Sequence, residues 1–303
     1  MLLKNKVIIS GSSGFVGQNL IAYLRDAFIE TVLPSRKELY GLPAEFFSRS
    51  AAIIHLAGKA HDLKNTSEPD EYYKVNYDLT KKLYDTFLQS EATKFIFISS
   101  VKAAADKVDG ILTEDFIPSP ETHYGKSKFI AEEYIQSQPL PEGKSYYILR
   151  PCMIHGPGNK GNLNLLFKFI SKGIPYPLTA FDNKRSFLSI DNLCFIIKEI
   201  LERDDIPSGI YNVADDESLS TNELISIIAE GAELKPRLLN INKRIILGLA
   251  KLGDLMGMPL NSEKLQKLTE NYVVDNSKIK SVLGMELPVT ARKGILKTIR
   301  SFR

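Results

Sequence analysis

The first half of the chain alternates short apolar runs with longer segments of helical spacing. The runs cover residues 7–9, 31–33, 52–54, 95–98 and 146–149 and are rich in β-branched and aromatic residues. Because they are continuous rather than alternating, they predict strands buried on both faces of a sheet. The segments between them, such as 15–28 and 69–90, have the length of helices. This order predicts βαβ units in a doubly wound parallel α/β sheet with right-handed crossovers.

After residue 151 the pattern changes. Residues 156–161 and 173–182 are interrupted by Gly and Pro, which indicates loops. A Ser or Thr followed by an acid marks a new helix near residue 220, and residues 243–255 have helical spacing. We therefore expect a dinucleotide-binding Rossmann-type domain of residues 1–160 plus about 186–212, and a smaller C-terminal α/β substrate domain of about 161–185 and 213–303.

Composition and charge exclude several classes of protein. Apolar residues make up 44% and charged residues 25% of the chain, and 39 Lys and Arg against 36 Asp and Glu give a net charge of +3. This balance favours an ordinary globular protein with no nucleic-acid partner and no membrane insertion. Cys152 and Cys194 form no close pair, which argues against a disulfide framework and structural zinc. With no signal-peptide pattern and no uncharged stretch of ~20 residues, we expect a soluble cytoplasmic protein without a metal.

Three glycines stand where the first strand meets the first helix. Gly11, Gly14 and Gly17 enclose Ser13, Phe15 and Val16. Glycines permit a tight turn and a close approach of the backbone, and the helix N-terminus can receive a pyrophosphate. The junction therefore predicts a dinucleotide-binding turn.

A second group of residues predicts proton transfer. Tyr124 and Lys128 lie four residues apart on an expected helix, where ~400° of rotation and ~6 Å of rise place both on one face. A free tyrosine has a pKa near 10, so proton transfer near neutrality needs a neighbouring cation, which Lys128 can supply. Ser100 follows the strand 95–98, at the carboxyl edge where open α/β sheets bind ligands.

The glycine spacing and the Tyr124–Lys128 pair resemble those of the short-chain dehydrogenase/reductase superfamily, and further motifs resemble its extended branch, the NAD-dependent epimerase/dehydratase family. These motifs are His55-Leu56-Ala57-Gly58, Val75-Asn76, and Arg150-Pro151 followed by His155-Gly156-Pro157-Gly158. The resemblance implies that Ser100, Tyr124 and Lys128 are catalytic. It also implies that the cofactor is contacted by Leu56, Ala57, Gly58, Asn76, Ser99, Tyr124, Lys128 and Pro151. His155 replaces a tyrosine of the family, and we expect it to pack rather than to catalyse.

The same resemblance implies a substrate site and a dimer. It places Arg185 on the diphosphate of a nucleotide sugar, Asn162 on the substrate and Tyr176 beside a uracil ring, with Ser100 and Tyr124 on the sugar. A solvated loop arginine is the alternative for Arg185. The second diphosphate arginine of the family is missing, and Lys264 or Lys267 is the expected substitute. The family habit implies a homodimer through helices near 69–90 and 124–136.

Two departures from the family narrow the reaction. Dehydratases of the family follow the catalytic Ser or Thr with Asp-Glu, whereas Val101 and Lys102 stand here, so an elimination lacks its acid/base pair. Ser35 and Arg36 stand 18 and 19 residues after Gly17, where members that prefer NAD keep an acid. A hydroxyl and a cation accept a 2′-phosphate, so NADP(H) is favoured, with NAD(H) as the alternative because Glu38 is close by.

These observations favour an NAD(P)-dependent oxidoreductase that acts at C4 of a nucleotide-diphosphate hexose. The first interpretation is a UDP-4-keto-6-deoxy-N-acetylhexosamine reductase for surface polysaccharide synthesis. The second is a UDP-hexose 4-epimerase, which uses the same residues and retains its cofactor. A non-catalytic NAD(P)-sensing regulator is the alternative of another class, and the presence of Tyr124 with Lys128 argues against it.

Overall fold

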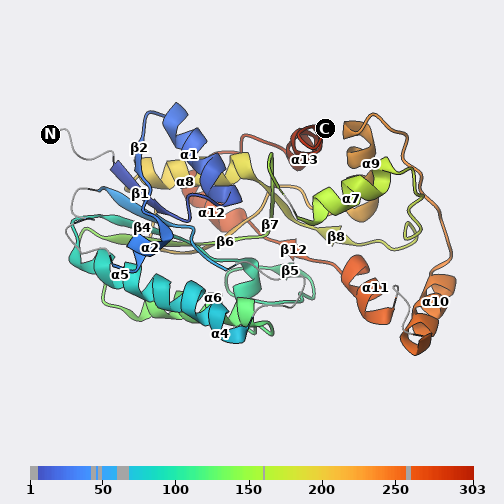
Figure 1. Cartoon of the computed structure of the whole chain (residues 1–303), viewed down its shortest axis with the longest axis horizontal. Coiled ribbons are helices and arrows are strands. Elements are labelled where there is room, and N and C mark those ends of the chain that lie inside the picture. Colours follow the sequence, from blue (N-terminus) through green and yellow to red (C-terminus); the bar gives the residue numbers. More distant parts are fainter. Residues whose placement is uncertain (1–5, 42–45, 47–49, 60–67, 160, 257–260) are drawn as a thin grey trace.

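The structure, a computed structural model, describes residues 6–41, 46, 50–59, 68–159, 161–256 and 261–303. Its centre is a six-stranded parallel sheet in the order β10-β6-β4-β3-β1-β2 (Figure 1). These strands are β1 (Lys6–Ser10), β2 (Glu30–Val32), β3 (Ala52–His55), β4 (Lys94–Ile98), β6 (Ser145–Pro151) and β10 (Gly209–Val213). The sheet confirms the predicted Rossmann-type α/β class, and its first five strands in chain order are the five apolar runs.

Three pairs of short strands lie outside this sheet. They are β5 (Ile111–Leu112) with β12 (Val273–Val274), β7 (Met153–His155) with β9 (Phe187–Ser189), and β8 (Lys184–Arg185) with β11 (Leu219–Ser220). Helices connect the strands. In the first half they are α1 (Phe15–Asp26), α2 (Arg36–Leu39), α4 (Pro69–Tyr73), the π-helical segment η1 (Lys74–Asp78), α5 (Leu79–Gln89), the 3₁₀ turn η2 (Val101–Ala103) and α6 (His123–Ser137). In the second half they are α7 (Asn162–Ser171), α8 (Ile190–Glu202), α9 (Thr221–Gly231), α10 (Lys243–Met256), α11 (Ser262–Thr269), α12 (Ser277–Leu283) and α13 (Ala291–Arg300).

Alternate residues of each central strand pack on opposite faces of the sheet. Ile53, Phe95 and Ile148 pack in one cluster with side chains of α5 and α6, and Ile54, Ile96 and Leu149 pack in the other with side chains of α1, α8 and α12. Figure 1 shows α5 and α6 below the sheet and α1 and α8 above it. Burial of one such side chain stabilises the fold by roughly 1.5–3 kcal/mol, which explains why the strands are apolar at every position.

The second half of the chain builds its own cluster. Side chains of α7, α9 and α13 pack together around Leu163, Ile228 and Ile295, and a smaller cluster around Leu178 joins α10 to α11. Ser220 caps α9 in a capping box with Glu223, as the sequence predicted. Residues 274–287 return to the main sheet, where Ile279 and Leu283 of α12 join its core. The proposed domain boundaries stay a prediction.

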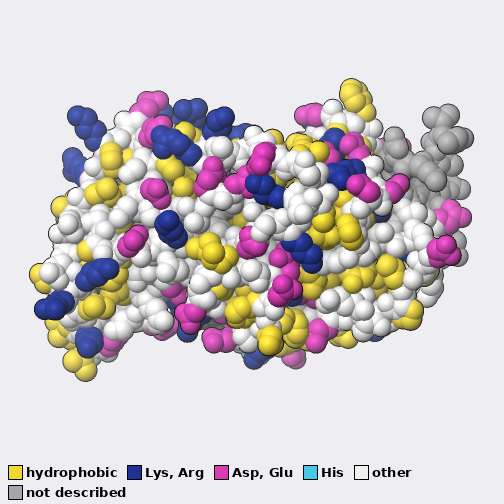
Figure 2. Space-filling view, turned by 180° about the vertical axis from the view of Figure 1, so that it is seen from behind, with side chains coloured by type: hydrophobic (Ala, Val, Ile, Leu, Met, Phe, Trp, Pro, Cys, Tyr) yellow, Lys and Arg dark blue, Asp and Glu magenta, His cyan; other side chains and the backbone are white. Residues whose placement is uncertain are grey.

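The surface seen from behind carries mixed charge. Figure 2 shows Lys and Arg side chains interspersed with Asp and Glu over this face. Within the described ranges, every helix is too short or too polar to span a bilayer.

Candidate active site

The glycine turn has no room for side chains. Gly11 has φ +76°, and a Cβ built on it would lie 2.6 Å from the backbone nitrogen of Ala57. A Cβ on Gly17 would lie 2.4 Å from the carbonyl oxygen of Gly11. Gly14 is the N-cap of α1, and no side chain caps this end. The first turn, with Phe15 and Val16, therefore presents backbone N–H groups that can bind a phosphate, and the site fits a dinucleotide.

A chain of hydrogen bonds supports this turn from beneath. The Ala57 N–H donates to Ser10 Oγ (3.2 Å), which lies 2.6 Å from His55 Nδ1. His55 Nε2 lies 2.9 Å from Thr80 Oγ1, and the Thr80 hydroxyl donates to the carbonyl of Asn76 (2.7 Å). Because Thr80 gives its proton to that carbonyl, it accepts from Nε2, so Nε2 of His55 carries a proton. Burial and the charge of Lys128 lower the pKa of His55 to about 3.

Asn76 lies in the π-helical segment η1 and is fully buried. Its amide accepts from the backbone N–H of Lys59 (2.7 Å) and donates to the carbonyl of Lys59 (3.1 Å). It also donates to Ser127 Oγ on α6 (2.9 Å). Asn76 thus joins the segment after β3 to the helix that carries Tyr124 and Lys128.

The structure brings Ser100, Tyr124 and Lys128 together. Ser100 follows β4 and caps η2, where its Oγ accepts from the Lys102 N–H (3.2 Å). Tyr124 is half-buried in the first turn of α6; burial raises its pKa, and a side-chain hydrogen bond with Ser100 acts in the opposite direction. This pair can hold one oxygen atom of a substrate between two hydroxyls.

Lys128 lies one turn further along α6 and is buried. Its Nζ donates to the carbonyl of Ile98 (2.9 Å) and lies 4.7 Å from the centre of the Phe97 ring. A Cβ built on Gly58 would lie 3.1 Å from this Nζ, so a larger residue at position 58 would require the Lys128 side chain to shift by a few tenths of an ångström. The pKa of Lys128 is lowered to about 8 by burial, although the negative charge of Glu132 acts in the opposite direction.

Ser99 is bonded behind the site. Its hydroxyl donates to the carboxylate of Glu132, which also pairs with Arg150 (Nη2 to Oε2, 2.5 Å). From the sequence, Arg150 is predicted only as part of a motif, and Glu132 is not predicted as a site residue. The position of Glu132 four residues after Lys128, on the same face of the helix, was the available signal.

At the end of β2, Ser35 caps the short helix α2. Its Oγ accepts from the Glu38 N–H (3.3 Å), and Glu38 Oε2 accepts from the Ser35 N–H (2.7 Å). These bonds lower the pKa of Glu38. Arg36 is exposed. The carboxylate of Glu38 is therefore held on backbone, while the Arg36 side chain faces solvent.

On the substrate side, Arg185 is held against α11. Its guanidinium donates to the carbonyls of Lys267 and Glu270 and pairs with the Glu270 carboxylate at 3.5 Å. Burial lowers the pKa of Arg185. Burial also raises the pKa of Tyr176 to about 12, and the positive charge of Arg185 acts in the opposite direction on Tyr176. Arg185 thus interacts with Tyr176, and it is half-buried in β8 and bonded to the end of α11 rather than solvated in a loop.

The structure says less about the other residues that were predicted to contact the substrate. Asn162 begins α7, but its side chain lies outside the described residues. Lys267 is exposed and pairs with Glu263 (2.6 Å), and the backbone N–H of Lys264 is bonded by Asn261.

Lys102 occupies the position of the missing acid/base pair. Its Nζ donates to the carbonyl of Asp106 (2.7 Å) and lies 4.7 Å from the centre of the Tyr272 ring. Asp106 accepts from the backbone N–H groups of Glu121 and Thr122 just before α6. Its carboxylate is therefore engaged at the start of that helix.

Pro151 and His155 lie at the carboxyl end of β6 and in β7. Pro151 pairs in register with Val213 of β10. His155 is fully buried, with Nδ1 2.9 Å from Thr298 Oγ1 and Nε2 3.6 Å from the Asp215 carboxylate.

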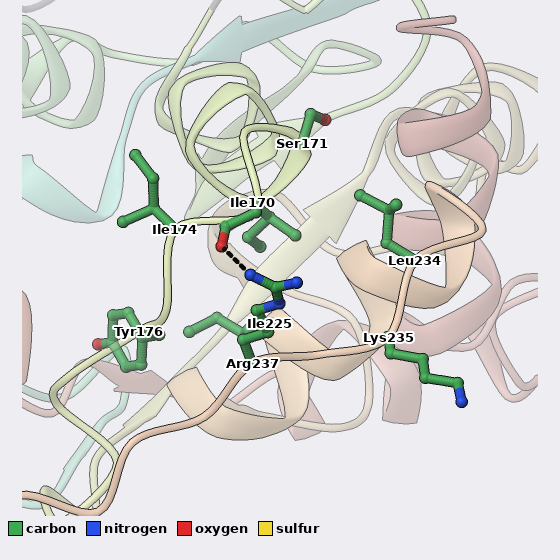
Figure 3. A pocket seen from close by; sticks show the side chains of 9 residues that line it. Ile170, Ser171, Ile174, Tyr176, Ile225, Leu234, Lys235 and Arg237 are labelled. Atoms are coloured by element: carbon green, nitrogen blue, oxygen red, sulfur yellow. Dashed lines mark hydrogen bonds between the residues drawn. The ribbon is translucent and has the colours of Figure 1, made fainter.

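A small pocket is lined in part by Tyr176, one of the residues predicted to contact the substrate. Figure 3 shows it between the end of α7, the chain through Tyr176, α9 and the segment that follows α9. It measures about 150 Å³, and the Arg237 guanidinium crosses it to the carbonyl of Gly173 (3.1 Å). Its lining is Ile170, Ser171, Gly173, Ile174, Tyr176, Ile225, Leu234, Lys235 and Arg237.

Comparisons with known proteins identify relatives of this chain. The model of the NAD dependent epimerase/dehydratase family matches residues 7–214. The UDP-glucose 4-epimerase of Vibrio cholerae is 30% identical over 326 residues, which covers 99% of this chain and 96% of that protein. The UDP-2-acetamido-2,6-beta-L-arabino-hexul-4-ose reductase of Pseudomonas aeruginosa is 30% identical over 161 residues, covering 52% of this chain and 38% of that protein.

Solved structures show the same fold. MoeE5 in complex with UDP-glucose and NAD superposes with a TM-score of 0.75 at 20% identity, covering 98% of each chain. RMD from Pseudomonas aeruginosa complexed with NADPH gives a TM-score of 0.73 at 21% identity, again covering 98% of each chain.

Proposed function

We propose, from the premise that this chain belongs to the NAD-dependent epimerase/dehydratase family, that it reduces the C4 ketone of a UDP-4-keto-6-deoxy-N-acetylhexosamine for surface polysaccharide synthesis. The chain is an enzyme of nucleotide sugars that works with a nicotinamide cofactor. The sugar, the preference for NADP(H) and the biosynthetic role are the parts that the proposal adds.

The residues of the site divide the chemistry among them. A bound nicotinamide cofactor supplies the hydride to C4. Ser100 and Tyr124 hold the ketone oxygen, and Tyr124 delivers the proton to it as the alcohol forms. A tyrosine whose pKa is raised by burial stays protonated, as a proton donor must. Lys128 binds the nicotinamide ribose and offsets the negative charge that develops on Tyr124.

Lys102 supports a reductase or an epimerase over a dehydratase. An elimination needs an acid and a base beside the catalytic Ser. Positions 101 and 102 offer no carboxylate, and the Asp106 carboxylate is bonded at the start of α6. The enzyme would then act on a ketone that a separate dehydratase has made.

The main support for a reductase comes from the residues that follow β2. Ser35 and Arg36 are exposed there, and the neighbouring carboxylate of Glu38 is bonded to the backbone of Ser35. A hydroxyl and a cation suit a 2′-phosphate although Glu38 is close by, because the carboxylate of Glu38 is bonded to the Ser35 backbone, and NADP(H) is the form that a reductase exchanges in every cycle.

A UDP-hexose 4-epimerase is the second candidate, because the Vibrio cholerae UDP-glucose 4-epimerase aligns with 99% of this chain. An epimerase regenerates its cofactor in every cycle, whereas a reductase oxidises one NADPH per product. The deciding measurement is NADPH absorbance with a UDP-4-keto-6-deoxy-N-acetylhexosamine, beside interconversion of UDP-galactose and UDP-glucose with NAD. We expect NADPH consumption that is lost in Tyr124→Phe. Interconversion without net NADPH loss would replace the reductase by the epimerase.

A further inference from the structure

Behind the catalytic residues lies a fully buried ion pair that the proposed chemistry does not use. Glu132 on α6 has no exposed surface, and Arg150 on β6 is 1% exposed. Arg150 Nε lies 3.1 Å from both carboxylate oxygens of Glu132, and Nη2 lies 2.5 Å from Oε2. The hydroxyl of Ser99 donates to the same carboxylate.

Stability alone is a weak explanation for this pair. Transfer of two charges into the interior costs several kcal/mol per ion, and apolar residues of similar volume often stabilise a fold as well or better. In addition, Arg150 Nη1 is buried without a hydrogen-bond partner among the described residues. The Nη1 group of Arg150 therefore makes no bond to the described residues, an exception among buried polar groups that calls for an explanation.

The position of the pair links it to the catalytic residues. Glu132 lies one helical turn after Lys128, and Tyr124 lies one turn before it. All three residues therefore share one face of α6. Ser99 directly precedes Ser100, and Arg150 lies on β6, the strand next to β4. The Glu132 carboxylate thus ties α6 to the ends of two strands at the level of the site.

We propose that Glu132 is a positioning residue, whose carboxylate, fixed by Arg150 and Ser99, supplies the negative charge that holds the Lys128 ammonium in the site. This inference rests on the proposed function only for the role of Lys128 in the reaction. The contacts and charges around Lys128 are features of the chain itself.

The groups that face Lys128 from the surrounding elements leave this task to Glu132. From β4 it meets the carbonyl of Ile98 and the Phe97 ring. From β3 the nearest titratable group is His55, whose pKa is lowered to about 3, so it is neutral near pH 7. Asn76 of η1 lies across Gly58 and carries no charge. On α6 itself the titratable groups are Tyr124 and Glu132, and Glu132 is the group that raises the pKa of Lys128 against burial.

Removal of this charge has a defined consequence. Burial alone favours the neutral amine, and an opposite charge within a few ångströms raises a lysine pKa by about one unit or more. In Glu132→Gln, Lys128 should therefore lose its proton at a pH about one unit lower than in the wild type. The alkaline limb of kcat, which we expect near pH 8 from Lys128, should move down with it.

The test is a titration of Lys128 in the full-length protein by NMR of ¹³Cε-labelled lysine, with the signal assigned through Lys128→Met. Glu133→Gln is the matched control, because it makes the same change at the next residue, which is exposed. We expect the Lys128 midpoint to fall in Glu132→Gln and to stay in Glu133→Gln. If Glu132→Gln does not fold, Glu132→Gln/Arg150→Gln removes both buried charges and should still lower the Lys128 midpoint, by less than the single variant, because the Arg150 cation is removed with the carboxylate.

An unchanged Lys128 midpoint in whichever of these variants folds would overturn the inference and leave the pair a structural one. This titration needs neither substrate nor cofactor. A protein without reductase or epimerase activity would contradict the proposed function while the titration still decides the role of Glu132. Where activity is present, a parallel move of the Lys128 midpoint and of the alkaline limb of kcat is the expected result.

Discussion

Acidification is expected to destabilise the protein through one buried side chain, His55. Its imidazole accepts from Ser10 at Nδ1 and donates to Thr80 at Nε2. Protonation of Nδ1 turns an acceptor into a second donor that faces the hydroxyl proton of Ser10, and it places a charge in the interior. The structure therefore resists protonation, which is why the pKa of His55 falls from 6.5 to about 3.

The sign and the size of the effect follow from this shift. Because the folded state binds the proton more weakly than the unfolded chain, stability is full above pH 6.5 and falls as the pH drops toward about 3. Each unit of pH in this window removes about 1.4 kcal/mol, so the free energy of unfolding should be about 2.5–3 kcal/mol lower at about pH 4.5 than at about pH 7.5. Because pH 4.5 lies well above the pKa of His55 in the folded state, the loss of stability depends almost entirely on protonation of His55 in the unfolded chain.

The assay is urea unfolding followed by circular dichroism at several pH values, in the wild type and in His55→Gln. Other groups also titrate in this range, so the difference between the two pH dependences isolates His55. Glutamine cannot be protonated, so the variant should be less stable at neutral pH but should lose about 2.5–3 kcal/mol less on acidification. His123→Gln, at an exposed residue of α6, is the matched control and should keep the wild-type slope. Equal slopes in wild type and His55→Gln would refute the reasoning.

Three further substitutions test the site. Tyr124→Phe should lower turnover by about a hundredfold or more while cofactor binding, measured by calorimetry, persists; near-normal turnover would contradict the role of Tyr124 as proton donor. Arg36→Asp should weaken NADPH binding much more than NADH binding, and tighter binding of NAD(H) than NADP(H) by the wild type would show that Ser35 and Arg36 were misread. Arg185→Ala should raise the KM for the nucleotide sugar by ~10-fold or more with a smaller effect on the cofactor; unchanged UDP binding would limit Arg185 to its contacts with α11.

The sheet was predictable because each strand is a local signal. Runs such as residues 95–98 are apolar at every position, and a parallel strand buried on both faces requires this pattern. Ser100 and the Tyr124–Lys128 pair were likewise found by local rules, the end of a strand and the pitch of a helix. The structure adds the Ser100–Tyr124 hydrogen bond, which joins residues from two separate elements.

Local sequence patterns do not predict contacts between residues that are distant in the sequence. Arg185 is bonded by the end of α11, more than 80 residues further along the chain, so the sequence could not distinguish a held side chain from a solvated one. The Glu132 carboxylate meets Arg150 only because α6 returns the chain to β6. The π-helical segment was hidden as well, since residues 69–90 keep helical spacing throughout.

Deletion of one residue from the π-helical segment η1 would show what this segment contributes to the protein. A π turn arises when a helix accommodates one extra residue, and it is intrinsically less favourable than the α-helix it interrupts. Loss of a single residue between 74 and 78 would let α4 and α5 fuse into one regular helix, turned by about 100° across the junction. The fused helix would be the more stable local structure, but its turn would no longer aim Asn76 at Lys59 and Ser127. It would also turn the buried Tyr72 of α4 away from the face that carries the buried Leu83 of α5, so the deletion should lower both the stability and the activity of the protein.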